Sequence, residues 1–590
     1  MKQFFKFTFA SMLGFIFANI LILILSIAII GGIAASAGSK KTATIEDNSI
    51  LKIEFSNPIT DRASNNPFKN FNFMSGESNQ GYGLNDILDA LEKAKTDDKI
   101  KGIYLHLDNV PAGMATTEEI RNALLDFKKS GKFIVAYSNG YDQKAYYLST
   151  VADELLVHPE GGLDFRGLSA SVMFLKGTLE KLELEPQIIR HGKFKSAIEP
   201  LILDKMSAAN REQTSTYMNA LWNRMLEGIS SARKISVEEL TKLANTAAIR
   251  NTKDAVKYKL ADKTAYEDEV LANLRKRVGL EKETDKIKFI SLGKYFDAPD
   301  KEKEKAKDKI AVIYASGNIV DGQGEDDNIG GDRIAATIRK ARLDEKVKAI
   351  VLRVNSGGGS ALASDVMWRE VVLAKKAKPV VVSMGDVAAS GGYYISCAAD
   401  RIFASPNTIT GSIGVFGVLL NAKKMFNNKL GITIDTVRTN KFADMGAAYR
   451  PLTDQEREII QTGVEDIYTT FITHVGEGRK ISTANVDSIG QGRVWAGTDA
   501  KRINLVDEFG GLKDAIAYAV KLSKLDKFKV VDYPEQEEPF QKIMKQLSGE
   551  GEDVIMKAQL GEQYEYYKKI RQALQVKGIQ ARIPYEFEVY

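Results

Sequence analysis

Short apolar runs alternate with amphipathic segments along most of the chain, and the alternation is clearest in the C-terminal half. The runs predict strands and the segments between them predict helices, in the order "KIAVIYA" (309–315), "DRIAATIRKARLD" (332–344), "VKAIVLRVN" (347–355), "SDVMWREVVLAKKA" (364–377) and "PVVVSMG" (379–385). Strands that are apolar on both faces and separated by helices are typical of a mostly parallel sheet covered on both sides. We therefore expect an α/β fold whose active site lies at the carboxyl ends of the strands.

The second half of the chain repeats the first. The segment "DDKIKGIYLHLD" (97–108) matches "DEKVKAIVLRVN" (344–355), and "AYYLSTVADELLVHP" (145–159) matches "GYYISCAADRIFASP" (392–406). Three further pairs keep the same spacing, so that all five pairs lie 245–248 residues apart. A constant offset over five segments indicates a tandem duplication of a whole domain rather than a solenoid, whose period is far shorter.

The duplication and the charge pattern divide the chain into parts. We expect one copy at residues 42–296 and the second at residues 309–530. Residues 297–308 are highly charged and show no apolar periodicity, which is typical of an exposed linker. Residues 531–590 form a C-terminal tail to which the sequence assigns no role.

The N-terminus differs from the rest of the chain, because no charged residue occurs from Phe7 to Ser39. This stretch exceeds the roughly 20 apolar residues that cross a bilayer as a helix, and also the roughly 7–15 apolar residues of a secretory signal. We therefore expect residues 1–41 to be an uncleaved anchor with a transmembrane helix at about residues 7–37. Cleavage after the Ala-Ser-Ala tripeptide at 35–37 is the alternative. Lysines flank the stretch on both sides, so the positive-inside rule leaves the orientation open.

Composition narrows the classes of function. The chain has 82 basic and 77 acidic residues, a net charge of +5 and no long basic stripe, so we expect no nucleic-acid partner. Cys397 is the single cysteine, and no group of cysteines and histidines has the spacing of metal ligands. We therefore expect no metal ion and no other cofactor. The chain has only four histidines, which leaves few candidates for histidine-based catalysis.

Two glycine-rich turns follow predicted strands of the second copy, namely "NSGGGS" (355–360) and "ASGG" (389–392). A helix N-terminus presents unpaired N–H groups, and glycine lets the backbone approach a ligand closely. Two such turns side by side direct two N–H donors at one oxygen, which makes an oxyanion hole. We expect the donors to be the amides of Gly359 and Gly391. The turns match neither the Walker A nor the dinucleotide pattern, and a purely structural turn is the alternative.

The two copies differ at two positions that bear on catalysis. Ser390 precedes the predicted helix, where a serine serves as a helix cap or as a nucleophile, and the first copy has Gln143 there. Conversely, Lys195 of the first copy, in "RHGKFKSAIEP" (190–200), matches Ala443 of the second. A single active site shared by the copies explains both differences, with the serine as nucleophile and the lysine as its base. Drift after duplication is the alternative.

Four motifs carry a family resemblance. The segments "RVNSGGGS", "GDVAASGGYYIS", "TGSIGVFG" and "KSAIEP" resemble the long, duplicated form of the signal peptide peptidase A family, also called protease IV. The resemblance covers the anchor and both copies, and the motifs agree with the family in order and spacing. It implies tandem duplicated Clp-protease/crotonase-like domains that form a peptidase with a serine–lysine dyad. One departure is visible: the family pattern is N-S-P-G-G, and Gly357 stands here in place of the proline.

The resemblance also implies roles for individual residues. Ser390 becomes the nucleophile and Lys195 the general base and acid, while Ser412 of "TGSIG" orients the lysine and Ser196 is a weaker candidate for that task. A free lysine has a pKa near 10.4 and is a poor base at neutral pH. A desolvated position between the two copies would lower the pKa of Lys195 by disfavouring its charged form.

Further expectations follow from the family. The substrates would be signal peptides already released from preproteins, which stay in the membrane beside an anchored enzyme. The family places its catalytic domains on the periplasmic side of the bacterial inner membrane, with a single membrane pass, and forms homo-oligomers, here a homotetramer. Two readings compete with this one. A crotonase-type acyl-CoA enzyme would leave the anchor and Lys195 unexplained, and a non-catalytic membrane scaffold would need neither Ser390 nor Lys195.

Overall fold

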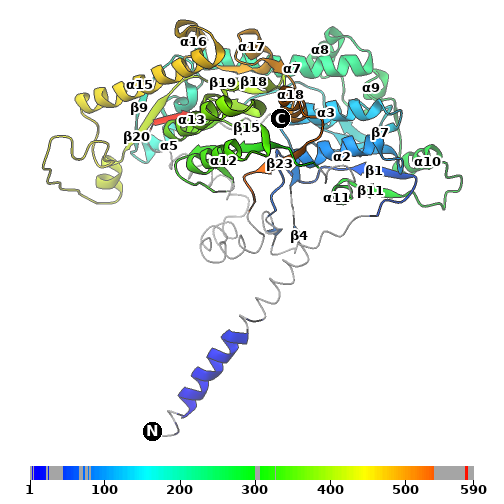
Figure 1. Cartoon of the computed structure of the whole chain (residues 1–590), viewed down its shortest axis with the longest axis horizontal. Helices are drawn as coiled ribbons and strands as arrows, with labels where there is room; N and C mark the ends of the chain where they lie inside the picture. Colours follow the sequence, from blue (N-terminus) through cyan, green and yellow to red (C-terminus); the bar gives the residue numbers. More distant parts are fainter. Residues whose placement is uncertain are drawn as a thin grey trace.

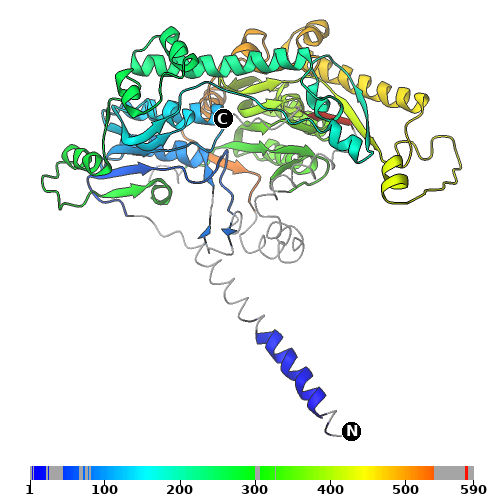
Figure 2. The same cartoon turned by 180° about the vertical axis from the view of Figure 1, so that it is seen from behind.

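The computed structural model of the chain describes residues 3, 6–21, 24, 44–65, 71–72, 77–78, 81–298, 306–325, 327–536 and 579–582. Figure 1 shows two α/β bodies side by side, one built mainly from each half of the chain. Figure 2 gives the same arrangement from behind, and helix 6–21 lies apart from both bodies in the two views.

The N-terminal body is built on a six-stranded parallel sheet in the order β10-β8-β7-β6-β1-β11. Its strands are β1 (Ser49–Ile53), β6 (Ile100–His106), β7 (Phe133–Tyr141), β8 (Glu154–Leu163), β10 (Lys263–Thr264) and β11 (Phe289–Ser291). Its helices are α2 (Leu84–Thr96), α3 (Met114–Lys128), α4 (Gln143–Ser149), α5 (Lys176–Lys181), α6 (Glu199–Ile202), α7 (Ala208–Arg233), α8 (Val237–Asn245), α9 (Thr252–Lys257), α10 (Glu267–Arg277) and α11 (Leu292–Phe296), with the 3₁₀ helix η1 (Ser196–Ile198). Two small sheets pair β2 (Ile59–Thr60) with β5 (Tyr82–Gly83) and β3 (Phe71–Asn72) with β4 (Glu77–Ser78).

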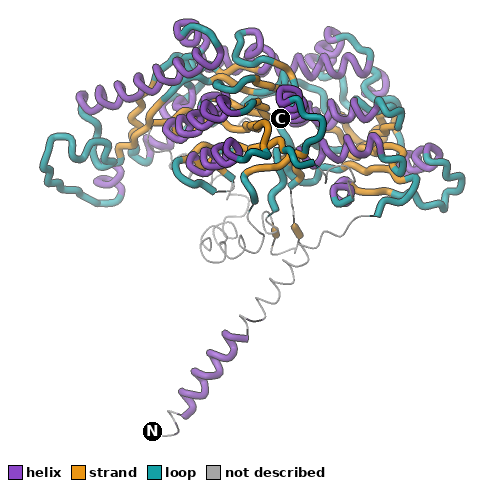
Figure 3. Tube along the Cα trace, in the orientation of Figure 1, coloured by secondary structure: helices purple, strands orange, loops and turns teal. Residues whose placement is uncertain are grey.

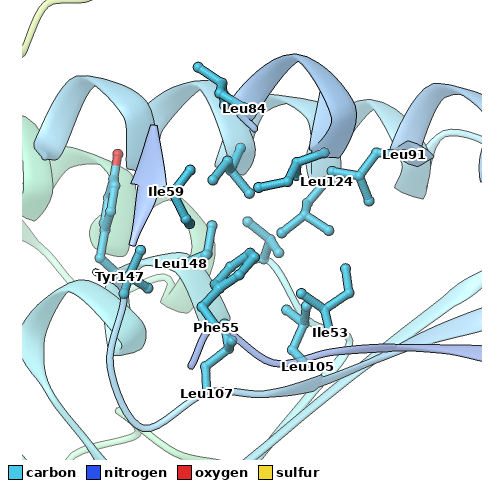
Figure 4. Close-up of a cluster of buried hydrophobic side chains, with 14 of the residues drawn as sticks. Ile53, Phe55, Ile59, Leu84, Leu91, Leu105, Leu107, Leu124, Tyr147 and Leu148 are labelled. Carbon is cyan, nitrogen blue, oxygen red and sulfur yellow. The ribbon is translucent and has the colours of Figure 1, made fainter. Parts of the chain in front are cut away.

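An aliphatic core joins this sheet to the helices above it. Figure 4 shows Ile53 and Leu105 from the strands facing Leu84 and Leu91 of α2 and Leu124 of α3. All five side chains are buried and belong to one cluster. The burial of such side chains contributes about 1.5–3 kcal/mol each, and it holds the helices on the sheet.

The C-terminal body repeats this architecture. Its main path of strands runs β21-β19-β17-β15-β12-β23, and off this path β18 pairs with β17 and β22 pairs with β18. The strands are β12 (Lys309–Ser316), β15 (Val347–Ser356), β17 (Val380–Ala389), β18 (Arg401–Ala404), β19 (Ile409–Gly411), β21 (Val494–Ala496), β22 (Glu508–Phe509) and β23 (Lys529–Tyr533). The helices are α12 (Gly331–Leu343), α13 (Ala361–Ala377), α14 (Gly391–Ser396), α15 (Asp454–Arg479), α16 (Thr483–Ile489), α17 (Gly497–Arg502) and α18 (Leu512–Ser523), with the π-helical turn η2 (Met425–Lys429). The shared order β7-β6-β1-β11 and β17-β15-β12-β23 confirms the duplicated α/β fold.

The duplication extends to the ends of the longest helices, α7 and α15. Each begins at a hydroxyl cap, because the side chain of Ser207 accepts the amide of Asn210 and that of Thr453 accepts the amide of Glu456. Each also ends at a lysine in the left-handed conformation, Lys234 in one copy and Lys480 in the other. In Figure 3 helices cover the strands of both bodies, as the apolar strands predicted.

The two bodies share part of their core. Along β12, Ile310 and Val312 pack into the same cluster as the core of the N-terminal body, whereas Ala311 and Ile313 pack into a separate C-terminal cluster. Successive side chains of a strand point to opposite faces, so the sheet of the second copy has one face toward the first copy. Helix α18 also contributes to the shared cluster, through Leu512 and other residues.

A buried ion cluster lies at the same interface. Arg353 of β15 forms ion pairs of 2.7 Å with both Asp61 and Glu119 of the first copy, and all three side chains are almost completely buried. Burial alone would raise the pKa of Asp61, but the charge and hydrogen bond of Arg353 lower it. Burial raises the pKa of Glu119, with Arg353 acting in the opposite direction. Removing one partner of a buried ion pair typically destabilises a protein by about 3–5 kcal/mol, so this cluster fixes how the copies dock.

A third sheet contains strands of both copies. Its order is β14-β13-β16-β24-β20-β9. The bounds are β9 (Glu185–Arg190), β13 (Asn318–Val320), β14 (Asn328–Gly330), β16 (Gly358–Ser360), β20 (Phe416–Asn421) and β24 (Ile579–Arg582). Strand β9 of the first copy pairs antiparallel with β20 of the second over six residue pairs, from Arg190 opposite Phe416 to Glu185 opposite Asn421. Backbone hydrogen bonds therefore link the copies directly.

Several expected segments lie wholly or partly outside the described residues. In the expected anchor, residues 6–21 are helical and carry exposed apolar side chains such as Phe7 and Phe15, but residues 25–41 are not described. Among the residues that are described, no helix is both long and apolar enough to span a bilayer. Residues 299–305 of the expected linker, and 537–578 and 583–590 of the expected tail, also lie outside the description. Strand β23 continues to Tyr533, three residues beyond the expected end of the second copy at residue 530.

Candidate active site

Ser390 stands in a strained turn between β17 and α14. Its φ of 55° and ψ of −115° place it in a region that residues with a side chain rarely adopt, at a typical cost of about 1–3 kcal/mol. The amide of Ser390 donates to the carbonyl of Gly411, which holds the turn against β19. The Ser390 side chain is fully buried and makes no cap hydrogen bond to α14. The helix-cap interpretation of Ser390 is therefore wrong, and the turn leaves its hydroxyl for another partner.

That partner comes from the first copy. Lys195 follows β9, and the backbone between them lies on the second copy, since the amide of Phe194 donates to the carbonyl of Gln491 over 2.9 Å. A Cβ on Gly192 would come within 2.5 Å of the Gln491 backbone, so this contact requires glycine. The inter-copy pairing of β9 with β20 thus directs the lysine into the second copy.

The lysine and the serine meet inside the protein. Lys195 Nζ lies 2.8 Å from Ser390 Oγ, 3.3 Å from the Ser412 carbonyl oxygen and 3.2 Å from Ser412 Oγ. A neutral amine has two N–H bonds and one lone pair. The two N–H bonds can donate to the two oxygens of Ser412, and the lone pair can accept the Ser390 hydroxyl. Ser412 Oγ can then donate to the Gly492 carbonyl oxygen at 3.3 Å, which completes the chain of hydrogen bonds.

The surroundings of the amine favour its uncharged form. Lys195 is fully buried, and this burial lowers its pKa well below the ordinary lysine value without a charged group contributing. Two glycines make room for the side chain. A Cβ on Gly492 would come within 2.7 Å of Lys195 Cα and Cβ, and one on Gly414 within 3.3 Å of Lys195 Cδ. The close packing excludes the solvent that would otherwise stabilise an ammonium ion.

The two glycine-rich turns lie beside each other, as the sequence predicted. A Cβ built on Gly358 would come within 2.7 Å of the Gly391 amide nitrogen. The amide of Gly358 donates to Ser356 Oγ at 3.1 Å, so it is already engaged within its own turn. Gly359 follows with φ 158° and is held by the pairing of β16 with β13, where it lies opposite Ile319. The assignment of Gly359 and Gly391 as oxyanion donors stays a prediction, and this geometry is compatible with it.

The matching position in the first copy holds no hydroxyl group. Gln143 there accepts the amides of Arg166 and Gly167 at 2.9 and 2.8 Å, and donates to the Gly167 carbonyl at 2.9 Å. These bonds join the start of α4 to the loop that corresponds to the region of Ser412 in the second copy. Gln143 therefore stabilises the fold where the second copy places its reactive hydroxyl.

A buried hydroxyl within hydrogen-bond distance of an uncharged amine is an arrangement suited to nucleophilic catalysis. Such an amine can accept the hydroxyl proton, and the amides of Gly359 and Gly391 are the predicted donors to a developing oxyanion. The described residues contain no group of histidine, cysteine, aspartate or glutamate side chains that could hold a metal ion.

Comparison with known proteins agrees with this chemistry. The model of peptidase family S49 matches residues 126–281 and 373–526, once in each copy. Protease 4 of Salmonella typhi is 39% identical over 484 residues, covering 80% of this chain and 78% of the relative. The chloroplastic serine protease SPPA of Arabidopsis thaliana is 36% identical over 491 residues, covering 82% and 72%. The chain belongs to peptidase family S49.

Membership of the S49 family makes the chain a serine peptidase of the protease 4 and SPPA type. Among solved structures, a ClpP1 mutant from Listeria monocytogenes matches with a TM-score of 0.24 and 14% identity, covering 35% of this chain and 94% of that one. The S49 family match and the protease 4 and SPPA relatives confirm the family resemblance on which the sequence analysis relied.

Two supporting residues of this S49 site were not predicted from the sequence. Gln213 of α7 donates to Ser196 Oγ at 2.8 Å and to the Phe194 carbonyl at 3.1 Å, and its own oxygen accepts the amide of Val494 in β21. It thus links both sides of the lysine loop to the second copy. Ser196, the weaker candidate for orienting Lys195, is instead engaged with Gln213.

Glu199 is the second supporting residue that the sequence did not predict. It is the glutamate of the "KSAIEP" motif, and its buried carboxylate accepts the amide and hydroxyl of Ser207 and the side-chain amide of Asn210 at the start of α7. The motif indicated that Glu199 matters. The sequence alone does not distinguish a structural role of Glu199 at the start of a helix from a catalytic role.

Replacing Lys195 with methionine should stabilise the protein at neutral pH. Because the folded-state pKa of Lys195 is depressed, the unfolded chain binds a proton that the folded chain lacks between that pKa and the ordinary value of about 10.4. Over this window the free energy of unfolding of the wild type rises with pH by up to about 1.4 kcal/mol per unit relative to Lys195→Met. Urea unfolding of both proteins at several pH values from 6 upward measures this difference.

Lys193→Met is the matched control, since Lys193 lies on the same loop but is exposed. Its stability relative to the wild type should change little with pH. A Lys195→Met protein that is less stable than the wild type, with no pH-dependent difference, would contradict the conclusion that the buried amine is uncharged.

Proposed function

We propose that the chain is an endopeptidase in which Ser390 and Lys195 form a catalytic dyad. The observation that carries this proposal is the 2.8 Å separation of Lys195 Nζ and Ser390 Oγ inside a fully buried site. Lys195 removes the hydroxyl proton while Ser390 Oγ attacks a peptide carbonyl carbon. The amides of Gly359 and Gly391 stabilise the oxyanion, and one such donor contributes about 3–4 kcal/mol in a well-measured case.

The lysine then completes the cycle. Lys195, now an ammonium ion, donates its proton to the departing amine, which leaves an acyl ester on Ser390. Water loses a proton to the regenerated neutral lysine and attacks the ester, which frees the acid product and restores the hydroxyl. Ser412 holds the lysine throughout by accepting its N–H bonds at 3.2 and 3.3 Å.

The proposed substrates are signal peptides that have been released from preproteins. Supporting this choice, residues 6–21 form an apolar helix with exposed Phe7, Phe9, Phe15 and Phe17, which suits an anchor at the membrane where such peptides reside. Family resemblance adds a single membrane pass and a site on the periplasmic side of the bacterial inner membrane. An acyl-CoA enzyme and a non-catalytic scaffold are not favoured, because the closely similar relatives named above are proteases.

We also propose that the chain forms a homo-oligomer, with a homotetramer expected from the family. Residues 436–438 of the second copy correspond to 188–190 of β9, but within the described part of the chain they belong to no strand. Their neighbourhood exposes Ile434 and Val437, the latter completely, and it projects from the body as the yellow loop in Figure 1.

The repeat indicates what covers this loop. Within one chain, β9 of the first copy pairs with β20 of the second. The first-copy counterpart of β20 is residues 169–174, which also form no strand and expose Met173. The same pairing between residues 433–438 of one chain and 169–174 of another would bury both segments and join chains head to tail.

The catalytic proposal predicts that Ser390→Ala and Lys195→Ala each lower kcat against a synthetic signal peptide by at least a thousand-fold while the protein stays folded. Ser412→Ala should lower it by a smaller factor, because a positioning contact is lost but the base remains. Because only the neutral amine is a base, wild-type kcat/KM should rise with pH through one ionisation well below the free-lysine value. Peptide cleavage followed by mass spectrometry measures these rates. Near-full activity of Lys195→Ala would exclude the dyad.

The anchor proposal predicts that the full chain stays in the membrane fraction after a carbonate wash, whereas a variant lacking residues 1–41 is released. Protease added outside spheroplasts should degrade the body of the full chain, since that side is the periplasmic one. A body that resists external protease until the cells are lysed would place the domains on the other side.

The oligomer proposal predicts that Val437→Asp together with Ile434→Lys dissociates the full chain in detergent to a smaller species, because charges would be buried in the new sheet. Analytical ultracentrifugation gives the masses. A matched control is Val237→Asp, an exposed valine at the start of α8 on a different surface, which should leave the mass unchanged. A wild-type chain that sediments as a monomer would rule out the interface.

A further inference from the structure

Three polar side chains of the second copy meet where α13, α14 and α15 come together. The hydroxyl of Tyr394 on α14 donates to Asp365 Oδ1 of α13 over 2.8 Å, and Nε2 of His474 on α15 lies 3.3 Å from the same oxygen. The ring of Trp368 on α13 stacks on the imidazole with the two centroids 3.4 Å apart, which fixes the orientation of His474. We call Tyr394, Asp365 and His474 the carboxylate cluster. The proposed mechanism does not use it.

The hydrogen bonds of the carboxylate cluster have a defined direction. The hydrogen bond with His474 holds the pKa of Asp365 below its ordinary value, so Asp365 is a carboxylate at neutral pH. Burial raises the pKa of Tyr394 well above its ordinary value, and Tyr394 therefore remains a hydroxyl. Because a carboxylate only accepts hydrogen bonds, Nε2 of His474 carries a proton and both neighbours donate. Asp365 thus holds α14 and α15 to α13.

The Asp365–Tyr394 bond joins the two helices that follow the predicted oxyanion donors. Helix α13 comes directly after β16, which contains Gly359, and α14 begins at Gly391. The amide of Tyr394 also donates to the Ser390 carbonyl oxygen over 2.8 Å. A displacement of Tyr394 would therefore move the turn that carries the nucleophile and one of the two predicted donors.

At the turns themselves the two helices touch through glycine. A Cβ on Gly391 would lie 2.7 Å from Ser364 Oγ, and a Cβ on Gly392 would lie 2.7 Å from the Ser356 carbonyl oxygen. These contacts limit how closely α14 approaches α13. The bond from Tyr394 lies about one helical turn farther along α14, so it fixes how α14 is rotated against α13.

The first copy has the same arrangement with a different base. Tyr147 is the counterpart of Tyr394, and its hydroxyl donates to the carboxylate of Glu118 on α3. Arg224 of α7 forms an ion pair with that carboxylate. The link between the two helices is thus part of the repeated architecture, but in the first copy it lies beside Gln143 and not beside a reactive hydroxyl. The first copy therefore supplies a matched control for the second.

We propose that the carboxylate cluster is a positioning group for the oxyanion hole, which holds the amides of Gly359 and Gly391 at the separation that one oxygen requires. This inference rests on the proposed function of the site, because it uses the same two donors. Donors that stabilise an oxyanion lie about 2.7–3.1 Å from it, so a small rotation of α14 weakens one donor. The cluster acts through the two helices and not on the substrate.

Tyr394→Phe tests the proposal, because it removes the hydroxyl and keeps the buried ring. We expect kcat against the synthetic signal peptide to fall by about ten- to a hundred-fold, since misplaced donors stabilise the transition state less, while KM changes by less than about two-fold. Steady-state cleavage followed by mass spectrometry gives both constants.

Tyr147→Phe is the matched control, because it removes the equivalent bond in the first copy. Both variants should lower the midpoint of urea unfolding, but Tyr147→Phe should leave kcat unchanged. An equal loss of kcat in the two variants would show a general effect of destabilisation and would overturn the proposal, as would full activity of Tyr394→Phe.

A peptide aldehyde with the substrate sequence tests whether the loss lies in the oxyanion hole. Ser390 Oγ forms a bond to the aldehyde carbon, the carbon–oxygen double bond becomes single, and the hydroxyl proton passes to Lys195, so that the former carbonyl oxygen is an oxyanion facing the donors. Its inhibition constant for Tyr394→Phe should rise by about the factor by which kcat falls. The corresponding peptide alcohol, which has no carbonyl, should inhibit Tyr394→Phe and the wild type equally. An aldehyde that also inhibits both equally would overturn the proposal.

Further variants test whether the cluster acts as a unit. Asp365→Ala should lower kcat as much as Tyr394→Phe, and the double variant should lose little more, because both changes break the same link. Additive losses would contradict a shared role. His474→Gln keeps an N–H donor for Asp365 and should retain more activity than His474→Ala, and equal activities of these two variants would exclude His474 from the cluster.

The failure of this proposal and the failure of the proposed function give different results. A wild type that neither cleaves the peptide nor is inhibited by the aldehyde would overturn the proposed function itself. A wild type that does both, together with a fully active Tyr394→Phe, would overturn only the role of the carboxylate cluster.

Discussion

The pairing of β9 with β20 is the constraint on which the site depends. Lys195 lies five residues beyond the end of β9, on a loop whose course is fixed by this pairing and by the contact with Gln491. A shift of register by one residue would move the lysine by about 3.3 Å and would turn every side chain of β9 to the other face. Either change exceeds the tolerance of a 2.8 Å contact with Ser390. The buried cluster of Arg353, with its two carboxylates, holds the bodies in the docking that allows this register.

Two basic side chains, Arg353 and Lys195, are buried where the copies meet, and their pKa values shift in opposite directions. Arg353 has ion pairs with Asp61 and Glu119, which raise its pKa and keep it charged against the effect of burial. Lys195 Nζ contacts hydroxyl and carbonyl oxygens, and no charged group in the described part of the chain offsets the burial that lowers its pKa. The difference lies in the neighbouring carboxylates rather than in the depth of burial. A carboxylate beside Lys195 would stabilise the fold more but would leave the amine protonated and useless as a base.

The sequence predicted the strands and helices, which depend on local pattern, and the two candidate catalytic residues, which emerged from comparing the two copies. Continuous apolar runs placed β12, β15 and β17, and the amphipathic segments placed the helices between them, because secondary structure follows local pattern. The asymmetry between the copies singled out Ser390 and Lys195, which the structure brings together over 195 residues of chain. The sequence could not reveal Gln213, whose role arises only when α7 packs on β21, or β24, a four-residue strand in a tail to which the sequence assigned no role. Both depend on contacts between segments far apart in sequence, which no local pattern encodes.

The first copy supplies Lys195 and the second supplies Ser390, and this asymmetry determines where active sites could form if chains assemble. Within one chain, the lysine loop of the first copy enters the second copy and meets Ser390. If chains join through the same pairing, the corresponding loop of a second copy would enter the first copy of its neighbour. It would bring Ala443 in place of the lysine to a position filled by Gln143, whose bonds to Arg166 and Gly167 already close the space. Junctions between chains would then be structural and junctions within chains catalytic. In such an assembly the divergence of two residues after duplication would leave one active site per chain, and each site would form before the chains associate.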